Sequence, residues 1–283
     1  MATCRQSIWI GYNTVMTILW IILFFMVGAA IGSFINVVAD RLPKGKSIVS
    51  PPSHCSECQH QISASDNIPI ISYLWLRGRC RNCSATIPQR LLWVELGTAI
   101  LFAFLYWHYG LGWELALVVL YCCLFISLLL IDLEHSILPN KIVYPGIIIA
   151  LAIASLGSIF GFEPSDIVGG GFRLWIVDAA VGGGIGFGLL FVIALISRGG
   201  MGWGDVKLAA LIGLVTGFPL VFLAMFLGIV GGGLTAAILL LAKLKSRKDA
   251  IPFGPFLSLA AMITIFWGSN ILNWLIPYLS PHS

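Results

Sequence analysis

Glycine residues crowd against one carboxylate between two long apolar stretches of the chain. Asp205 is preceded by glycines at positions 199, 200, 202 and 204. An aspartate at the centre of a membrane helix costs roughly 2.5–3.5 kcal/mol, so such residues usually face a partner, a water-filled cavity or a substrate. Glycines allow backbone shapes and close approaches that other residues forbid. We therefore consider Asp205 a candidate functional carboxylate.

A second aspartate, Asp132, ends an apolar run and precedes Pro139 and Asn140, which we interpret as the break and cap before the next helix. Asp132 would then lie in the last turns of one helix and Asp205 in the first turn of another. Two carboxylates that share a site cannot both ionise cheaply. One can act as a base on water while the other, protonated, polarises a scissile carbonyl, as in aspartic proteases. Either residue alone could instead be a solvated interfacial residue or a helix cap.

Helix dipoles suggest a division of labour between the two carboxylates. A helix C-terminus disfavours negative charge and an N-terminus favours it. The sequence therefore predicts that Asp132 is the more readily protonated partner in the resting protein.

Four further polar residues show weaker patterns. Lys207 lies two positions after the second aspartate and points elsewhere on the helix, which favours a headgroup anchor over a catalytic role. His135 could share the face of the first aspartate, although a solvated position is the simpler reading. Glu95 could line the site or lie at the interface. Asp178 is interpreted as polar packing or as cavity lining.

The composition excludes an ordinary soluble domain. Hydrophobic residues make up 59% and charged residues 10% of the 283 residues, whereas soluble domains carry about 25% charged residues. Repeated apolar stretches of about 20 residues predict an all-α polytopic membrane protein. Eight transmembrane helices are predicted at residues 14–38, 91–109, 113–131, 142–160, 173–197, 205–217, 220–242 and 253–278.

The basic residues orient these helices. Of the 16 Lys and Arg residues, only Arg5 and Arg173 fall on one side of the predicted spans. The positive-inside rule places the other side in the cytoplasm, with both termini outside and Asp132 and Asp205 at the cytoplasmic face. The cytoplasmic basic residues are Arg41, Lys44, Lys46, Arg77, Arg79, Arg81, Arg90, Lys141, Arg198, Lys207, Lys243, Lys245, Arg247 and Lys248.

A polar segment at residues 39–90 carries two C-x-x-C pairs. The four residues are Cys55, Cys58, Cys80 and Cys83. Two such turns about 20 residues apart are typical of a structural Cys₄ zinc site. A redox pair is the alternative, but disulfides are disfavoured in a reducing cytoplasm. His54 and His60 flank the first pair and are interpreted as solvated loop residues.

The sequence thus predicts three parts. Residues 1–38 hold the first transmembrane helix, residues 39–90 a small cytoplasmic zinc-binding domain, and residues 91–283 a seven-helix membrane domain. A metal would stabilise the middle part, which is too short to build a large core.

The chain resembles the bacterial type IV prepilin peptidases, a family of GxGD-type intramembrane aspartic proteases. The blocks that carry the resemblance occur in order along most of the chain. They are Gly32–Val38 with Arg41–Pro43, the two cysteine pairs with Asp66–Pro69 and Arg77–Cys80, Val94–Leu96, Ile131–Pro139, Gly202–Lys207 and Pro252–Pro255. Asn140 stands where the family often has Asp.

The resemblance implies two activities. The first is cleavage of the leader of prepilins and pseudopilins after a glycine at the cytoplasmic face, with Asp132 and Asp205 matching the catalytic pair. The second is N-methylation of the new N-terminal residue, usually Phe, with S-adenosyl-methionine as donor. In the family the cysteine-bearing domain is associated with methylation.

The resemblance further implies a multi-pass protein of the bacterial inner membrane with a structural Zn²⁺. Prepilins and the lipid bilayer are the expected partners, and nucleic acid is not. No glycine-rich strand–turn–helix pattern marks a methyl-donor site. The sequence leaves open the residues that bind the donor, the pilin or secretion system served and the oligomeric state.

Alternative functions remain at this stage. A proton-coupled transporter could use Asp132, Asp178 and Asp205, since intramembrane acids are common in transporters. A membrane scaffold could use the zinc segment to bind a partner. The chain could also be a peptidase without methylase activity.

Overall fold

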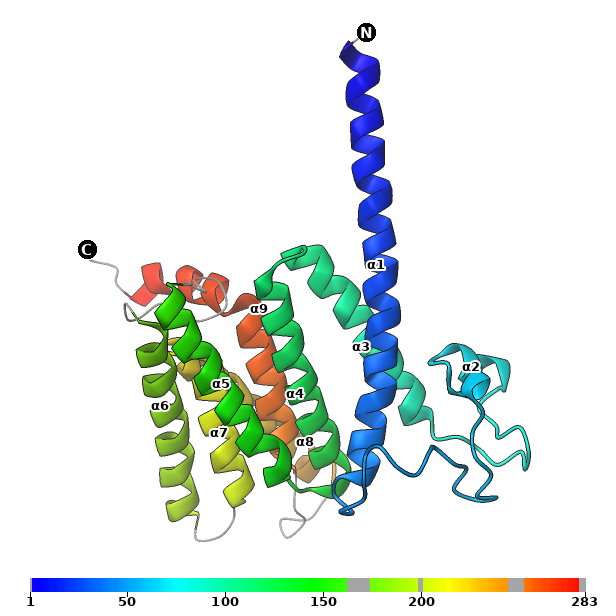
Figure 1. Cartoon of the computed structure of the whole chain (residues 1–283). Coiled ribbons are helices and arrows are strands. Elements are labelled where there is room, and N and C mark those ends of the chain that lie inside the picture. The colour runs from blue at the N-terminus through cyan, green and yellow to red at the C-terminus, as the bar shows by residue number, and fades with distance from the viewer. Residues whose placement is uncertain (1, 162–173, 198–200, 244–251, 280–283) are drawn as a thin grey trace. The chain divides into compact units, whose positions relative to one another are not determined.

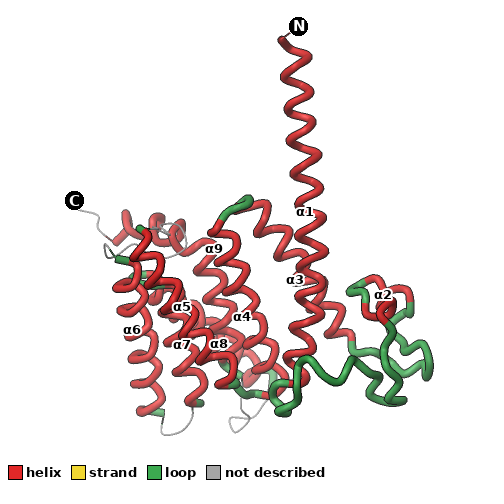
Figure 2. The backbone as a smooth tube through the Cα atoms, viewed as in Figure 1, coloured by secondary structure: helices red, strands yellow, loops and turns green. Residues whose placement is uncertain are grey.

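We analysed a computed structural model, which describes residues 2–161, 174–197, 201–243 and 252–279, with side chains from residue 14 to residue 275. In these ranges every regular element is a helix (Figures 1 and 2). The predicted all-α membrane class is therefore confirmed. The glycine-rich start at 198–200, the predicted outer loop near 162–172 and the basic residues 245–248 lie outside the described residues.

The elements follow one another along the chain with short connections. They are α1 (Ala2–Arg41), the 3₁₀ turn η1 (Ala64–Asn67), α2 (Ile71–Trp75), α3 (Gln89–Tyr109), α4 (Trp113–His135), α5 (Asn140–Phe160), α6 (Trp175–Ile196), α7 (Trp203–Thr216), α8 (Leu220–Leu241) and α9 (Gly254–Leu279).

Among the described residues, seven helices are long and apolar enough to cross a membrane: α1, α3, α4, α5, α6, α8 and α9. The eighth predicted span corresponds to α7, which has only 14 residues. Such a helix is about 21 Å long, whereas the hydrocarbon core is about 30 Å thick. Because most of its side chains are buried, α7 is enclosed by protein rather than by lipid.

The chain forms two compact units, Met1–Val119 and Leu120–Ser283. In the first unit α1 packs along α3, and Gly28 and Gly32 of α1 make the close approach possible. A Cβ atom at Gly28 would lie 2.6 Å from the Thr98 carbonyl oxygen, and one at Gly32 would overlap the Thr98 hydroxyl. Small residues allow helices to approach closely in lipid, and these two glycines have that role between α1 and α3.

In the second unit α7 is the central helix. It packs against α5, α6, α8 and α9, and nine of its 14 residues, including all six from Leu211 to Thr216, are buried. The α6–α7 contact is the closest, because Gly182 and Gly213 face each other with no room for a side chain on either. The short helix therefore has a fixed position, and the residues at its N-terminus are fixed with it.

Candidate active site and metal centre

Asp132 lies in the last turn of α4, as predicted, and its residue surface is only 5% exposed. Its Oδ2 accepts a hydrogen bond of 3.0 Å from the backbone N–H of Gly254, the first residue of α9. The N-terminus of α9 thus faces the Asp132 carboxylate in the last turn of α4.

Gly254 is the residue that sequence reasoning missed. A Cβ atom at this position would lie 2.7 Å from Asp132 Oδ2, a distance that real Cβ atoms do not adopt without displacing a neighbour. Only glycine therefore allows the backbone N–H to reach the carboxylate at this spacing. The signal in the sequence was the Pro252–Pro255 block, which carried a resemblance but no assigned role.

Asp205 lies in the first turn of α7, again as predicted. The N-terminus of α7 packs against the connection that follows α4, because a Cβ at Gly204 would lie 3.0 Å from Leu138 Cβ. This contact brings Asp205 toward the end of α4, where Asp132 lies. The two predicted carboxylates are therefore brought together at one end of the same unit.

Lys207 connects α7 to α5, and its predicted contact with lipid headgroups stays a prediction. Its Nζ donates a 3.1 Å hydrogen bond to Asn140 Oδ1 and lies 5.1 Å from the centre of the Tyr144 ring. The cap predicted at Asn140 is accordingly wrong: Pro139 is the residue before the helix, and α5 begins at Asn140. Because its side chain binds Lys207, Asn140 joins two helices next to the aspartates.

The helix dipoles no longer distinguish the two aspartates. Asp205 is near the N-terminus of α7, and the Asp132 carboxylate faces the N-terminus of α9 as well as the C-terminus of its own helix. The positive end of α9 offsets the negative end of α4. The prediction that Asp132 holds the resting proton therefore loses its physical basis.

Asp178 does not belong to this site. It is buried in the first turn of α6, and that helix continues to Ile196, about 27 Å further along its axis, before the chain turns toward α7. Near Asp178, Gly182 of α6 packs against Gly213 in the last turn of α7. Asp178 and Asp205 are therefore at opposite ends of the α6–α7 pair.

Glu95 and His135 have different surroundings. Glu95 is buried in the first unit, where its Oε2 accepts a 2.8 Å hydrogen bond from the backbone N–H of Ile70. Its observed contact is therefore with the polar segment. His135 ends α4, and its buried Nδ1 has no hydrogen-bond partner among the residues that the structure describes.

The four cysteines of the polar segment converge. The sulfur atoms of Cys55, Cys58, Cys80 and Cys83 all lie within 4.8 Å of one another. A tetrahedral zinc site with Zn–S bonds of about 2.3 Å requires sulfurs about 3.8 Å apart, and Cys55 Sγ and Cys83 Sγ are separated by 3.7 Å. The donor set and its spacing thus fit a tetrahedral metal ion.

The two cysteine pairs have the same backbone conformation. In the first pair, the Cys55 N–H donates to the His60 carbonyl, and Gln59 has a φ of 56°. In the second pair, the Cys80 N–H donates to the Ala85 carbonyl, and Ser84 has a φ of 57°. An isolated β-bridge closes each turn. The segment therefore contains two equivalent knuckles, each directing two sulfurs to a common point.

The surroundings of the four thiols favour one thiolate but disfavour several at once when no cation is bound. Backbone N–H groups of Cys58 and Glu57 lower the pKa of Cys55 to about 6. The pKa of Cys83 is raised to about 12 despite a hydrogen bond from the Ala85 backbone, because desolvation and the other cysteines disfavour another thiolate. A divalent cation removes that repulsion by neutralising the thiolates.

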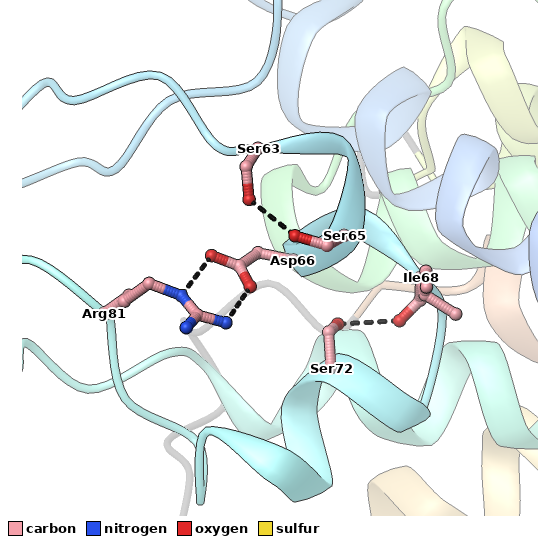
Figure 3. Close-up of polar contacts among 6 residues, drawn as sticks. All are labelled: Ser63, Ser65, Asp66, Ile68, Ser72 and Arg81. Carbon is pink, nitrogen blue, oxygen red and sulfur yellow. Dashed lines mark hydrogen bonds and ion pairs between the residues drawn. The ribbon is translucent and has the colours of Figure 1, made fainter.

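Asp66 ties the second knuckle to η1. Arg81 donates from Nε to Asp66 Oδ2 at 2.9 Å and from Nη2 to Oδ1 at 2.5 Å (Figure 3). These hydrogen bonds hold the pKa of Asp66 below its usual value. The pair therefore stabilises the fold above the unfolded pKa of Asp66 and is lost as pH falls through the lower folded value.

Two family models match successive parts of the chain. Residues 26–109 match the bacterial peptidase A24 N-terminal domain, and residues 118–237 match the type IV leader peptidase family. The four cysteines fall in the first match, and Asp132 and Asp205 fall in the second.

Curated relatives match over nearly the whole chain. A prepilin leader peptidase/N-methyltransferase of Stutzerimonas stutzeri is 31% identical over 270 residues, which cover 87% of this chain and 90% of that protein. A protein of the same name from Bacillus subtilis is 30% identical over 257 residues, covering 90% and 97%. No solved structure matches the chain.

Proposed function

Because the chain belongs to the type IV leader peptidase family, we propose that it removes the leader of prepilins or pseudopilins by an aspartate-dyad mechanism. The observation that carries this proposal is the meeting of Asp132 and Asp205 at one end of the second unit. Three contacts hold them there: Gly254 with Asp132, Gly204 with Leu138 and Lys207 with Asn140.

In this mechanism one carboxylate is ionised and the other carries a proton. The ionised group accepts a proton from a water molecule as the water oxygen attacks the carbonyl carbon of the last leader residue, the glycine. The protonated group donates its proton to the carbonyl oxygen, which gives a tetrahedral intermediate. The C–N bond breaks as that intermediate collapses to a carboxylic acid: the proton taken from water passes to the leaving nitrogen, and a hydroxyl proton of the intermediate returns to the other carboxylate. The pair titrates as a unit, so the proton belongs to both groups.

The positive-inside pattern supports cleavage at the cytoplasmic face of a bacterial inner membrane. Both termini lie outside when the enclosed helix α7 counts as an eighth crossing. A substrate would lie with its apolar helix in the bilayer and its leader in the cytoplasm. The two carboxylates are at helix ends rather than helix centres. Water is available for hydrolysis at such ends.

For the polar segment we propose structural Zn²⁺ bound by Cys55, Cys58, Cys80 and Cys83. The ion would hold the two knuckles together and supply no step of the peptidase reaction. The domain division proposed from the sequence, with residues 39–90 as this zinc-binding part, is supported by the convergence of all four sulfurs within it.

The names of the relatives include an N-methyltransferase, and we propose the same second activity here, with S-adenosyl-methionine as methyl donor. The presence of the Cys₄ segment supports this assignment, because the cysteine-bearing domain is associated with methylation in the family. Mass spectrometry of the mature substrate tests it. A methyl group on the new N-terminus only when donor is present is expected, and an unmodified N-terminus in both samples would leave a peptidase without methylase activity.

The peptidase is tested by incubating the purified protein in lipid with a prepilin. We expect cleavage by the wild type and by Asp178→Asn, and none by Asp132→Ala or Asp205→Ala. A transporter that used all three acids would make Asp178→Asn as damaging as the other two changes. Its separation from Asp205 along α6 argues against such a shared site.

A further inference from the structure

Helix α2 exposes an apolar face on the polar segment. Ile71, Leu74 and Trp75 are 63%, 62% and 80% exposed, and their spacing places them on one side of the helix. Ile68, just before the helix, is also exposed. A contiguous apolar patch of this kind marks a surface that binds a protein or a membrane.

The other side of α2 is packed against the second knuckle. The Tyr73 hydroxyl donates to the Ile87 carbonyl, and its ring fills the space that a side chain at Gly78 would need. The turn into the helix is fixed too, because the Ser72 hydroxyl donates to the Ile68 carbonyl (Figure 3). The orientation of the apolar face is thus set by the fold of the segment.

Glu95 fixes the depth of α2. Its Oε2 binds the backbone N–H of Ile70, the residue before the helix. Glu95 lies in the membrane-spanning helix α3, five residues after Arg90, which pairs with Asp40 of α1 at 3.0 Å. Five helical residues rise about 7.5 Å, so the start of α2 lies on the membrane side of this ion pair.

The backbone conformation of Ile70 indicates that its contacts hold it in place. Its φ is 63°, which is rare for a β-branched residue and persists only where surrounding contacts dictate it. The buried Glu95 carboxylate provides such a contact.

The residues that follow α2 add positive charge next to Trp75, the last residue of the helix. Arg77 and Arg79 are exposed, and neither forms an ion pair with any residue that the structure describes. Tryptophan prefers the membrane–water interface, and basic side chains next to a bilayer bind anionic headgroups. Trp75 and the two arginines therefore have the chemistry of a lipid-binding surface.

We propose that the Ile71–Leu74–Trp75 face of α2 inserts into the interfacial layer of the adjacent lipid leaflet, with Arg77 and Arg79 on anionic headgroups. The positive-inside pattern identifies that leaflet as the cytoplasmic one. The surface holds the zinc segment against the membrane and does not depend on the proposed peptidase chemistry.

The test measures membrane depth directly. A spin label is attached through a ketone-bearing amino acid at position 75, and in a second variant at position 74, so that the metal-binding thiols are left intact. The full chain is reconstituted in nanodiscs of phosphatidylcholine with a minority of phosphatidylglycerol. A label at Asn82, an exposed polar residue of the second knuckle, is the reference.

We expect labels at 74 and 75 to be several-fold more accessible to oxygen than to a water-soluble nickel chelate, relative to the label at 82. Equal nickel accessibility at 75 and 82 would overturn the proposal and leave the face to a protein partner. The arginine contribution is tested by the double variant Arg77→Gln, Arg79→Gln. Its label at 75 should be shallower in phosphatidylglycerol-containing discs, and an unchanged depth would exclude the headgroup contact.

Discussion

At the scale of single residues, the position of Asp132 depends on Gly254. The backbone N–H of Gly254 reaches Asp132 Oδ2 because nothing occupies the place of a side chain at that position. The orientation of the proposed catalytic carboxylate is thus set by a residue that has no side chain of its own.

Gly254→Ala should greatly reduce leader cleavage. The new methyl group would meet Asp132 Oδ2 at 2.7 Å, so the carboxylate must move, and displacement of a catalytic group by about 1 Å can cost about 100-fold in rate. Single-turnover cleavage of a prepilin measures the effect. Gly233→Ala is the matched control, because a side chain there meets no atom within 4 Å; equal rates for the two variants would contradict the assigned role.

Two residues of the knuckles have left-handed backbones without being glycine. Gln59 and Ser84 follow the second cysteine of each pair, with φ of 56° and 57°. Replacing either by glycine should relieve strain, partly offset by the greater freedom of the unfolded chain. We expect a gain of up to about 1 kcal/mol and slower loss of zinc to a chelator.

Ser56→Gly is the control for this prediction, because Ser56 lies inside the first pair and is not among the residues with positive φ. The same substitution there should give no gain. Faster metal loss from Ser84→Gly than from the wild type would show that the backbone is not strained as described.

At the scale of elements, one hydrogen bond links α3 to the polar segment. Glu95→Leu would leave the Ile70 N–H without its buried acceptor, at a cost of about 1–3 kcal/mol. Hydrogen exchange of the amides in α2 should accelerate accordingly. Glu95→Gln keeps an acceptor oxygen and should have a much smaller effect; equal acceleration by both variants would point to the charge rather than the hydrogen bond.

The α5–α7 contact offers a second test at this scale. Asn140→Asp would place a carboxylate against Lys207, whose Nζ is now 3.1 Å from Asn140 Oδ1. An exposed ion pair adds up to about 1 kcal/mol, so the unfolding temperature in nanodiscs should rise slightly. Lys207→Met should lower it, whereas Lys141→Met, at an exposed neighbouring position, should not; a fall with Asn140→Asp would contradict the contact.

The sequence predicted helices better than it predicted contacts between them. Apolar length identifies the membrane spans, and the turns place Asp132 at one helix end and Asp205 at another. Side-chain partners depend on packing, however. Asn140 could be read only as a local cap, although its partner Lys207 is on another helix, and the contact of Gly254 with Asp132 joins residues 122 positions apart.

At the scale of the whole molecule, the two units carry different groups of polar side chains. The first holds a Cys₄ group on an α1–α3 hairpin, and the second holds the aspartate pair around a short, enclosed helix. The cysteine spacing alone was sufficient to predict that the four thiols converge. The shortness of α7 could also be seen in the sequence, but its enclosure by other helices depends on tertiary packing.

The zinc proposal predicts one metal ion per chain in the wild type and loss of that ion from the double variant Cys55→Ser, Cys58→Ser. Elemental analysis of protein purified in detergent measures it. The buried Cys122 of α4 is not near this group in sequence, so Cys122→Ser should retain the metal. Full metal content in the double variant would contradict the site.

The central claim is that Asp132 and Asp205 act as one catalytic unit. The most direct measurement is single-turnover cleavage of a prepilin by Asp132→Asn, by Asp205→Asn and by the double variant, all reconstituted in lipid. Groups that act together are strongly non-additive, so each single change should abolish cleavage and the double variant should be no worse. Near-wild-type cleavage by either single variant would contradict the account.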